Sequence, residues 1–165
     1  MLAKLRKIFE RTLEGIVLLL MVVLTTIVVV AVVYRKAGNS LSWYDEVASV
    51  LLAWLTYYGA AFAALKRSHI GFPGLLNSMR LSARIPLLII GETLVFFFFA
   101  VVAWAGFEVV RVLEFETLIS LPQVPARITQ SVIPIGAVLF IICEALSLID
   151  LWVQDIRPRL SKDRN

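Results

Sequence analysis

Two acidic residues inside apolar stretches are the side chains of this sequence best suited to chemistry. Glu92 and Glu144 each stand in a long run that is otherwise apolar. On insertion scales a carboxylate near the centre of a membrane helix costs about 2.5 to 3.5 kcal/mol, so its presence there needs a reason. We expect both to face protein, either sharing a proton or meeting a Lys or Arg of a partner chain. Two alternatives remain open, because each could instead reach the membrane interface or be protonated.

Other kinds of membrane chemistry lack the residues they require. Cys143 is the one cysteine, so a thiol–disulfide pair cannot form within the chain. His69 is the one histidine, which excludes haem held by two histidines of a single chain. Because it follows Lys66 and Arg67, we interpret His69 as an interfacial polar residue rather than a metal ligand. With no glycine-rich phosphate loop or zinc spacing, the sequence predicts no enzyme, cofactor or metal site.

The elements that must position these residues are membrane helices. The 165 residues are 60% hydrophobic and 17% charged, a balance that a water-soluble domain of this size could hardly cover with polar surface. A bilayer core about 30 Å thick needs roughly 20 helical residues. Four stretches meet that length, and they predict one all-α integral membrane domain over 1–165 with four transmembrane helices: 15–34, 47–65, 85–110 and 131–152.

The distribution of basic residues predicts the orientation of these helices. Twelve of the 16 Lys and Arg residues lie in the amino-terminal segment, the loop after the second helix and the carboxyl-terminal tail. Short loops rich in Lys and Arg stay in the cytoplasm, so both termini are predicted to be cytoplasmic. The net charge of +4 does not indicate nucleic-acid binding, because the basic residues stand at helix ends rather than in one patch.

Two further segments have predicted conformations outside the spans. Residues 2–14 alternate apolar and charged positions at helical spacing, which favours an amphipathic helix lying in the cytoplasmic interface. A short solvated tail is the alternative. Residues 118–125 are apolar but contain Pro122 and Pro125, so an irregular loop on the outer side is expected there.

The predicted helices also set the depth of the acidic residues. Glu92 lies about 10 Å along the third helix, and Glu144 about 12 Å from the end of the fourth, so the two are expected to share one depth. Glu108 and Arg111 are three residues apart and should pair on one helix face.

The second helix carries two features of its own. Gly59 and Ala63 form a small-xxx-small pair, which predicts a packing face inside the chain or against another protein. Before the helix, Trp43 suits the outer membrane interface, while Asp45 and Glu46 suit the positive amino terminus of the helix.

Four motifs follow one another along the chain. They are Trp43-Tyr44-Asp45-Glu46, Trp54 with Gly59-Ala60-Ala61, Lys66-Arg67-Ser68-His69-Ile70, and Ser131-Val132-Ile133-Pro134-Ile135-Gly136. In order and spacing they resemble the small membrane subunit of the TRAP transporters, the tripartite ATP-independent periplasmic systems, and so the chain is similar to the DctQ-like family. The resemblance extends over essentially the whole chain.

The resemblance implies partners and a cell compartment. It implies a bacterial or archaeal cytoplasmic membrane, a soluble periplasmic binding protein that captures an organic acid such as a C4-dicarboxylate or sialic acid, and a large membrane subunit with the substrate and sodium sites. The small subunit would scaffold the large one and help to dock the binding protein. Candidates for the partner interface or internal structure are Trp43, Asp45, Glu46, Gly59, Ala63, His69, Glu92, Pro134 and Glu144. Candidates for contact with the binding protein, or else solvated charges, are Arg35, Lys36, Glu114 and Glu116.

A rival interpretation is a stand-alone homo-oligomeric transporter or channel that uses Glu92 and Glu144 as a relay. Neither acid is predicted near the midplane, no helix is visibly broken for ion coordination, and the two halves show no repeat, all of which count against it. A membrane enzyme is a third class, which the missing Cys and His pairs disfavour.

Overall fold

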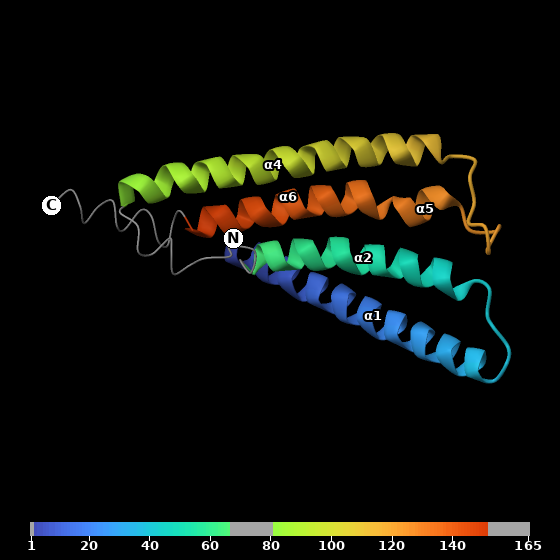
Figure 1. The fold of residues 1–165 in the computed structure, drawn as a ribbon. Coiled ribbons are helices and arrows are strands. Elements are labelled where there is room, and N and C mark those ends of the chain that lie inside the picture. The colour runs from blue at the N-terminus through green and yellow to red at the C-terminus, as the bar shows by residue number, and fades with distance from the viewer. Residues whose placement is uncertain (1, 67–80, 152–165) are drawn as a thin grey trace.

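The computed structural model describes residues 2–66 and 81–151, and helices dominate that part of the chain (Figure 1). They are α1 (Leu2–Lys36), α2 (Tyr44–Leu65), α4 (Leu81–Val112), α5 (Ala126–Gln130) and α6 (Val132–Leu151). Four stretches are long and apolar enough to cross a membrane: Arg6–Lys36, Tyr44–Leu65, Ile85–Val112 and Ala126–Ile149. The predicted all-α architecture with four membrane spans is therefore confirmed.

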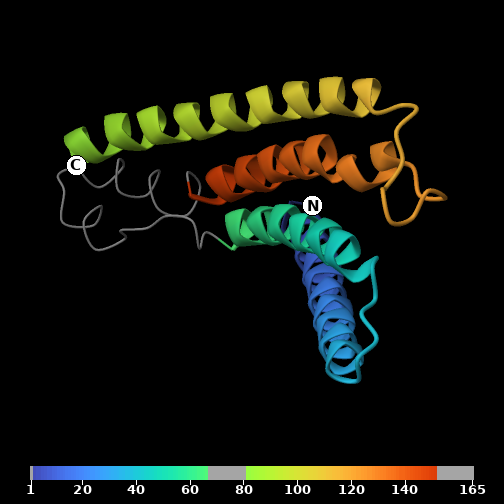
Figure 2. The same cartoon turned by 45° about the vertical axis from the view of Figure 1, so that its right-hand side comes forward.

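The long helices lie side by side in a row, in the order α4, α6, α2, α1 (Figures 1 and 2). The start of α1 and the end of α6 lie at the same end of the row, which we call the terminal end. The opposite end, with the connections 37–43 and 113–125, we call the loop end. Because α6 has a neighbour on each side, 44% of the most apolar part of its span is buried, against 0% for α4. A row of this kind leaves two broad faces open.

The buried core lies where α1, α2 and α6 meet near the terminal end. Its members are Leu13, Ala61, Ala64, Leu65, Phe140 and Cys143. Alanines on α2 let α6 approach closely, as small residues do between helices in lipid. Most large side chains on the other helix faces are exposed, which suits a lipid environment.

The first helix differs from its prediction in one respect. Residues 2–14 are helical as predicted, but α1 continues without a break through all 35 residues, so this segment and the first span form one helix. That the segment lies in the membrane interface stays a prediction. Leu13 is 2% exposed and packs in the core. Leu13 and the neighbouring Phe9 therefore meet protein, whereas Ile8 is 63% exposed. From this contact α1 diverges from α2 toward the loop end (Figures 1 and 2).

Specific residues end α1 and shape the fourth span. Gly38 has a φ of 85° and closes α1, with Asn39 N–H donating to the Tyr34 carbonyl at 3.0 Å.

The fourth span begins at Ala126, five residues before the predicted start, and is broken at Ser131 between α5 and α6. Pro134 accounts for the break, because it has no N–H to donate to the carbonyl four residues earlier and its ring crowds that turn.

Candidate functional site

A carboxylate at the loop end fastens the connection between α4 and α5. Glu46, in the first turn of α2, accepts hydrogen bonds from the backbone N–H of Ile119 at 3.0 Å and of Ser120 at 2.8 Å. The Ser120 hydroxyl donates a third hydrogen bond to the same carboxylate. Charge-assisted bonds of this type are among the stronger ones in proteins. Glu46 therefore joins the start of α2 to the connection between α4 and α5, in which Ser120 lies 74 residues further along the chain.

The connection itself has further internal bonds. Ala126 N–H donates to the Glu116 carbonyl at 2.9 Å, and Leu118 N–H donates to the Val124 carbonyl at 3.1 Å. Thr117 and Pro125 form an isolated antiparallel bridge. The predicted irregular loop over 118–125 is present, since no helix is assigned there. It is a closed loop rather than a loose one, because its two ends are hydrogen-bonded to each other.

A tryptophan links α2 to α5 close to this loop. The Trp54 indole N–H donates to the Thr129 carbonyl at 2.9 Å, and Thr129 is 7% exposed. That carbonyl lies next to the helix break at Ser131. The indole therefore stabilises a backbone group close to the break between α5 and α6.

Replacing Trp54 by phenylalanine should remove this bond while keeping most of the aromatic surface. We expect a loss of roughly 0.6 to 1.5 kcal/mol in the free energy of unfolding, the usual range for a single hydrogen bond between membrane helices. Thermal unfolding in mild detergent would measure it. Trp104→Phe is the matched control, because Trp104 is 69% exposed. Equal stability of the two variants would contradict the assignment.

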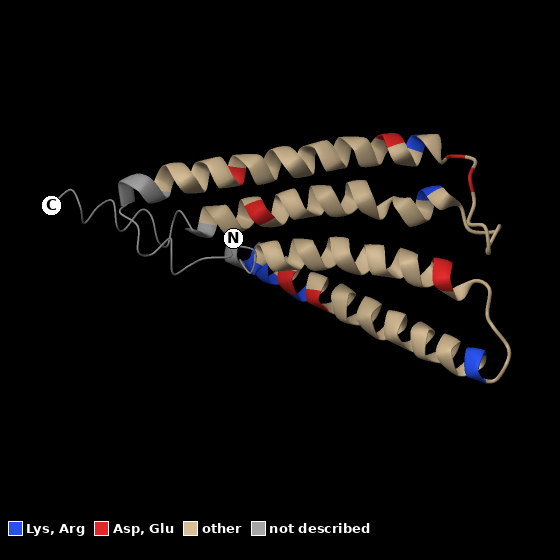
Figure 3. Ribbon diagram, viewed as in Figure 1, with Lys and Arg blue, Asp and Glu red and all other residues tan. Residues whose placement is uncertain are grey.

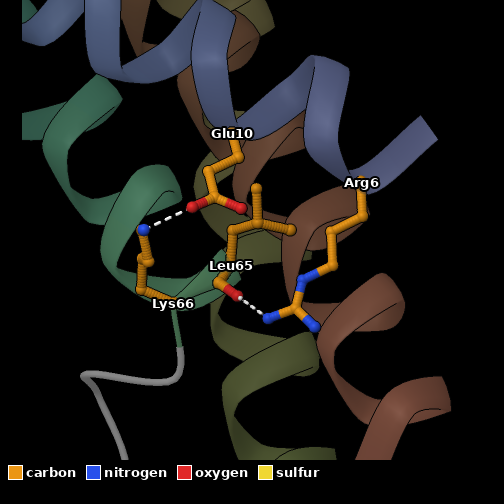
Figure 4. Close-up of polar contacts among 4 residues, drawn as sticks. All are labelled: Arg6, Glu10, Leu65 and Lys66. Carbon is orange, nitrogen blue, oxygen red and sulfur yellow. Dashed lines mark hydrogen bonds and ion pairs between the residues drawn. The ribbon is translucent and has the colours of Figure 1, made fainter. Parts of the chain in front are cut away.

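At the terminal end, α1 holds the end of α2 (Figure 4). Arg6 Nη2 donates to the Leu65 carbonyl at 3.0 Å, and Glu10 pairs with Lys66. Leu65 is the last residue of α2, so its carbonyl is one of those that a helix leaves without an internal donor. Arg6 satisfies it and also places a positive charge at the negative end of the helix. The amphipathic start of α1 therefore has a structural role inside the chain.

The two membrane carboxylates lie along the contact of α4 with α6. Phe99 stacks on Phe140 with ring centroids 3.6 Å apart, which fixes the register of these antiparallel helices. Glu92 and Ser147 are each seven residues from that pair, so they stand at one level on the facing sides. Glu144 is about 4.5 Å closer to the loop end. Glu144 is 7% exposed and Glu92 is half-buried.

Charges gather toward the two ends of the row, with acidic positions on α4 and α6 set inward from the terminal end (Figure 3). That Glu92 and Glu144 act together stays a prediction. The predicted pair of Glu108 with Arg111 is present at 2.9 Å. Among the described residues, no group of three or more His, Cys, Asp or Glu could hold a metal ion.

The close contacts between helices inside the chain are at Gly106 and Gly136 and not at Gly59, the glycine of the predicted packing face. A Cβ on Gly59 would meet no atom within 4 Å, and Ala63 is half-buried. In contrast, a Cβ on Gly136 would lie 2.6 Å from the Tyr57 Cβ, and one on Gly106 would lie 2.8 Å from the Pro134 Cδ. The packing face inside the chain therefore includes Gly106 and Gly136, which the sequence motif did not indicate.

The remaining predicted residues are placed as follows. Pro134 is buried against Gly106 on α4, Trp43 is half-buried before α2, and Asp45 is exposed with its carbonyl bonded to the Ser49 hydroxyl. His69 lies outside the described residues. The four candidates for contact with a soluble protein are all exposed at the loop end: Arg35, Lys36, Glu114 and Glu116. Arg35 also contacts Tyr44. Sequence reasoning missed Ile119 and Ser120, whose backbone N–H groups carry no sequence signal.

Comparison with known proteins gives one family. The sequence model described as "Tripartite ATP-independent periplasmic transporters, DctQ component" matches residues 24–154. This range includes the connection between α4 and α5, the hydrogen bond from Trp54 to Thr129, and the whole of α4 and α6. A comparison with curated proteins gives no match.

Proposed function

We propose that this chain, which belongs to the DctQ component family of tripartite ATP-independent periplasmic transporters, is the small membrane subunit and acts as a scaffold for a larger membrane subunit. The family match covers residues 24–154, and the four apolar helices make the chain a multi-pass membrane protein. Its work in this proposal is to hold the larger subunit in place, while the substrate path lies in that subunit.

The observation that carries this proposal is the open row of helices. The extensive contacts run from α4 to α6, from α6 to α2 and from α2 to α1, so the described helices do not close around a central path. Each broad face of the row is apolar and offers a long surface to another membrane protein or to lipid. A row stiffened by Trp54, Glu46 and the Phe99–Phe140 stack is well suited to support a partner.

The proposal includes an orientation and a substrate class. Among the described residues, a group of basic side chains lies near the terminal end: Lys4, Arg6, Lys7, Arg11 and Lys66. This supports placing that end in the cytoplasm and the loop end in the periplasm of a bacterial or archaeal cell. We propose that the complete transporter takes up a small organic acid with sodium ions, and that the sodium sites belong to the larger subunit. The support for substrate and ion is the resemblance of the motifs to the TRAP systems.

A mild-detergent affinity purification of the tagged chain from its native membrane tests the proposal. We expect one large polytopic membrane protein to co-purify in stoichiometric amount and to be identified by mass spectrometry after size exclusion. A pure homo-oligomer, reproduced after crosslinking in intact membranes, would contradict it.

The same preparation separates the scaffold from a stand-alone transporter. The buried Glu144 and the half-buried Glu92 on the facing sides of α6 and α4 are the observation that favours the rival. Liposomes that contain the chain alone should show no uptake, whereas liposomes with the co-purified pair should show it when the soluble component is added. Uptake by the chain alone, lost in Glu92→Gln and Glu144→Gln, would establish the rival instead.

A further inference from the structure

Two large apolar side chains project from the loop between α4 and α5. Phe115 is 92% exposed and Ile119 is 93% exposed, the highest values among the large apolar residues described. Within α4 the outward-facing Phe97 and Trp104 reach 69%, and the last residue, Val112, reaches 79%, because neighbouring turns of the helix cover part of each side chain. Phe115 and Ile119 lie beyond the last residue of α4, so they do not belong to the lipid-facing surface of a span.

The backbone that carries these side chains is held in one shape. Glu46 binds the N–H groups of Ile119 and Ser120, and the Glu116 carbonyl accepts the N–H of Ala126. A segment that is already ordered loses less conformational entropy when it binds a partner. The backbone that carries Phe115 and Ile119 is therefore already ordered, so the two side chains are exposed from a fixed loop and not from a flexible one.

The charges of the loop decide between a lipid surface and a protein as its partner. Between Val112 and Ala126 the charged residues are Glu114 and Glu116, and they flank Phe115. Segments that lie on membranes usually carry Lys and Arg, because anionic headgroups attract them and repel carboxylates. Inserting Phe115 among headgroups would bring both glutamates into that repulsive field. A protein surface with basic groups around an apolar pocket complements all three side chains.

We propose that residues 113–120 form a docking loop for a soluble protein that presents an apolar pocket rimmed by Lys and Arg. The docking loop rests on the proposed function, which supplies such a partner in the periplasmic component and places the loop end in the periplasm. Phe115 and Ile119 fill the pocket, Glu114 and Glu116 pair with its rim, and Glu46 holds the loop in position from behind.

The test uses the chain in complex with its large subunit in lipid nanodiscs, titrated with the purified periplasmic component of the same transporter. The double variant Phe115→Ser/Ile119→Ser should raise the Kd roughly tenfold or more, as expected for apolar anchors at the centre of an interface. Glu114→Gln/Glu116→Gln should weaken binding less and make it less dependent on salt. Ile128→Ser is the control, because Ile128 is 51% exposed on α5 outside the loop.

Three results would overturn the docking loop. One is an unchanged Kd in the double variant. Another is loss of the large subunit from the purified double variant, which would assign the loop to the contact between membrane subunits. The third uses a fluorophore on Ile119→Cys, since the buried Cys143 does not compete for the label. Shielding of that fluorophore from aqueous iodide before the soluble protein is added would mean that lipid or the large subunit already covers the loop.

Failure of the proposed function would give a result that differs from these three outcomes. In that case the unmodified chain would bring down no large subunit, and no complex could be prepared for titration. A complex that forms and transports, but binds the soluble component normally without Phe115 and Ile119, would leave the scaffold proposal standing and remove only the docking loop.

Discussion

Replacement of Gly136 by alanine is expected to force α2 away from α6 and to lower the stability of the chain. The new Cβ would lie 2.6 Å from the Tyr57 Cβ, a distance that real Cβ atoms essentially never show, and 3.0 Å from the Tyr57 ring, which is also tight. The obstacle includes the first side-chain atom of Tyr57, which cannot move without moving the α2 backbone. Overpacking of this kind costs roughly 1 to 3 kcal/mol and sometimes more. Thermal unfolding in mild detergent would measure the loss.

Gly59→Ala is the matched control on the opposing helix. A Cβ there meets nothing within 4 Å, and alanine favours a helix over glycine, so the purified chain should be as stable or slightly more stable. A stability loss at Gly59 equal to that at Gly136 would show that the helix register is wrong. If Gly59→Ala leaves the chain intact but reduces recovery of the large subunit, the packing face predicted around Gly59 and Ala63 lies between the two proteins.

Replacement of Glu46 by alanine should release the docking loop. The N–H groups of Ile119 and Ser120 would lose their acceptor, and so would the Ser120 hydroxyl. We expect these two amides to exchange with solvent roughly tenfold faster, because local opening then no longer breaks charge-assisted bonds. Hydrogen exchange followed by mass spectrometry on the 113–125 segment would measure the change. Binding of the periplasmic component should weaken together with the loss of protection.

Glu114→Ala is the control for charge at the same end of the chain. Glu114 is exposed on the docking loop, so its removal changes the local charge by the same amount without removing the acceptor at Glu46. Exchange at Ile119 and Ser120 should stay slow in this variant. Equally fast exchange in both variants, or slow exchange in both, would mean that Glu46 does not hold the loop.

The helices could be predicted from sequence because their signal is local. A run of apolar residues long enough to cross a bilayer specifies a helix whatever its neighbours are, and four helices overlap the four predicted spans. The start of the fourth span was placed too late, since residues 126–130 are polar enough to resemble a loop. The continuity of α1 was missed for a related reason: the amphipathic pattern of 2–14 is the same whether the apolar face meets lipid or protein.

The helix register could not be predicted, because it depends on residues that are distant in the chain. Gly59, Gly106 and Gly136 look alike in sequence, yet only the last two face an obstacle, at Pro134 and Tyr57 respectively. Glu46 was singled out as a helix-terminus acid, which is correct, but its donors lie 73 and 74 residues further on and two of the three are backbone groups. The buried position of Glu144 agrees with the expectation that it faces protein, whereas its role stays a prediction.

The position of α6 in the row has a consequence for how the protein is made. The helix between α2 and α4 leaves the ribosome after the other long helices described, while α4 has its extensive contacts with α5 and α6. Until residues 126–151 have entered the membrane, α4 and the α1–α2 hairpin lack the element that joins them. A nascent chain stopped before Ala126 should therefore hold α4 apart from the α1–α2 hairpin, open to quality-control proteases. Assembly with a partner subunit would then follow the entry of residues 126–151 into the membrane.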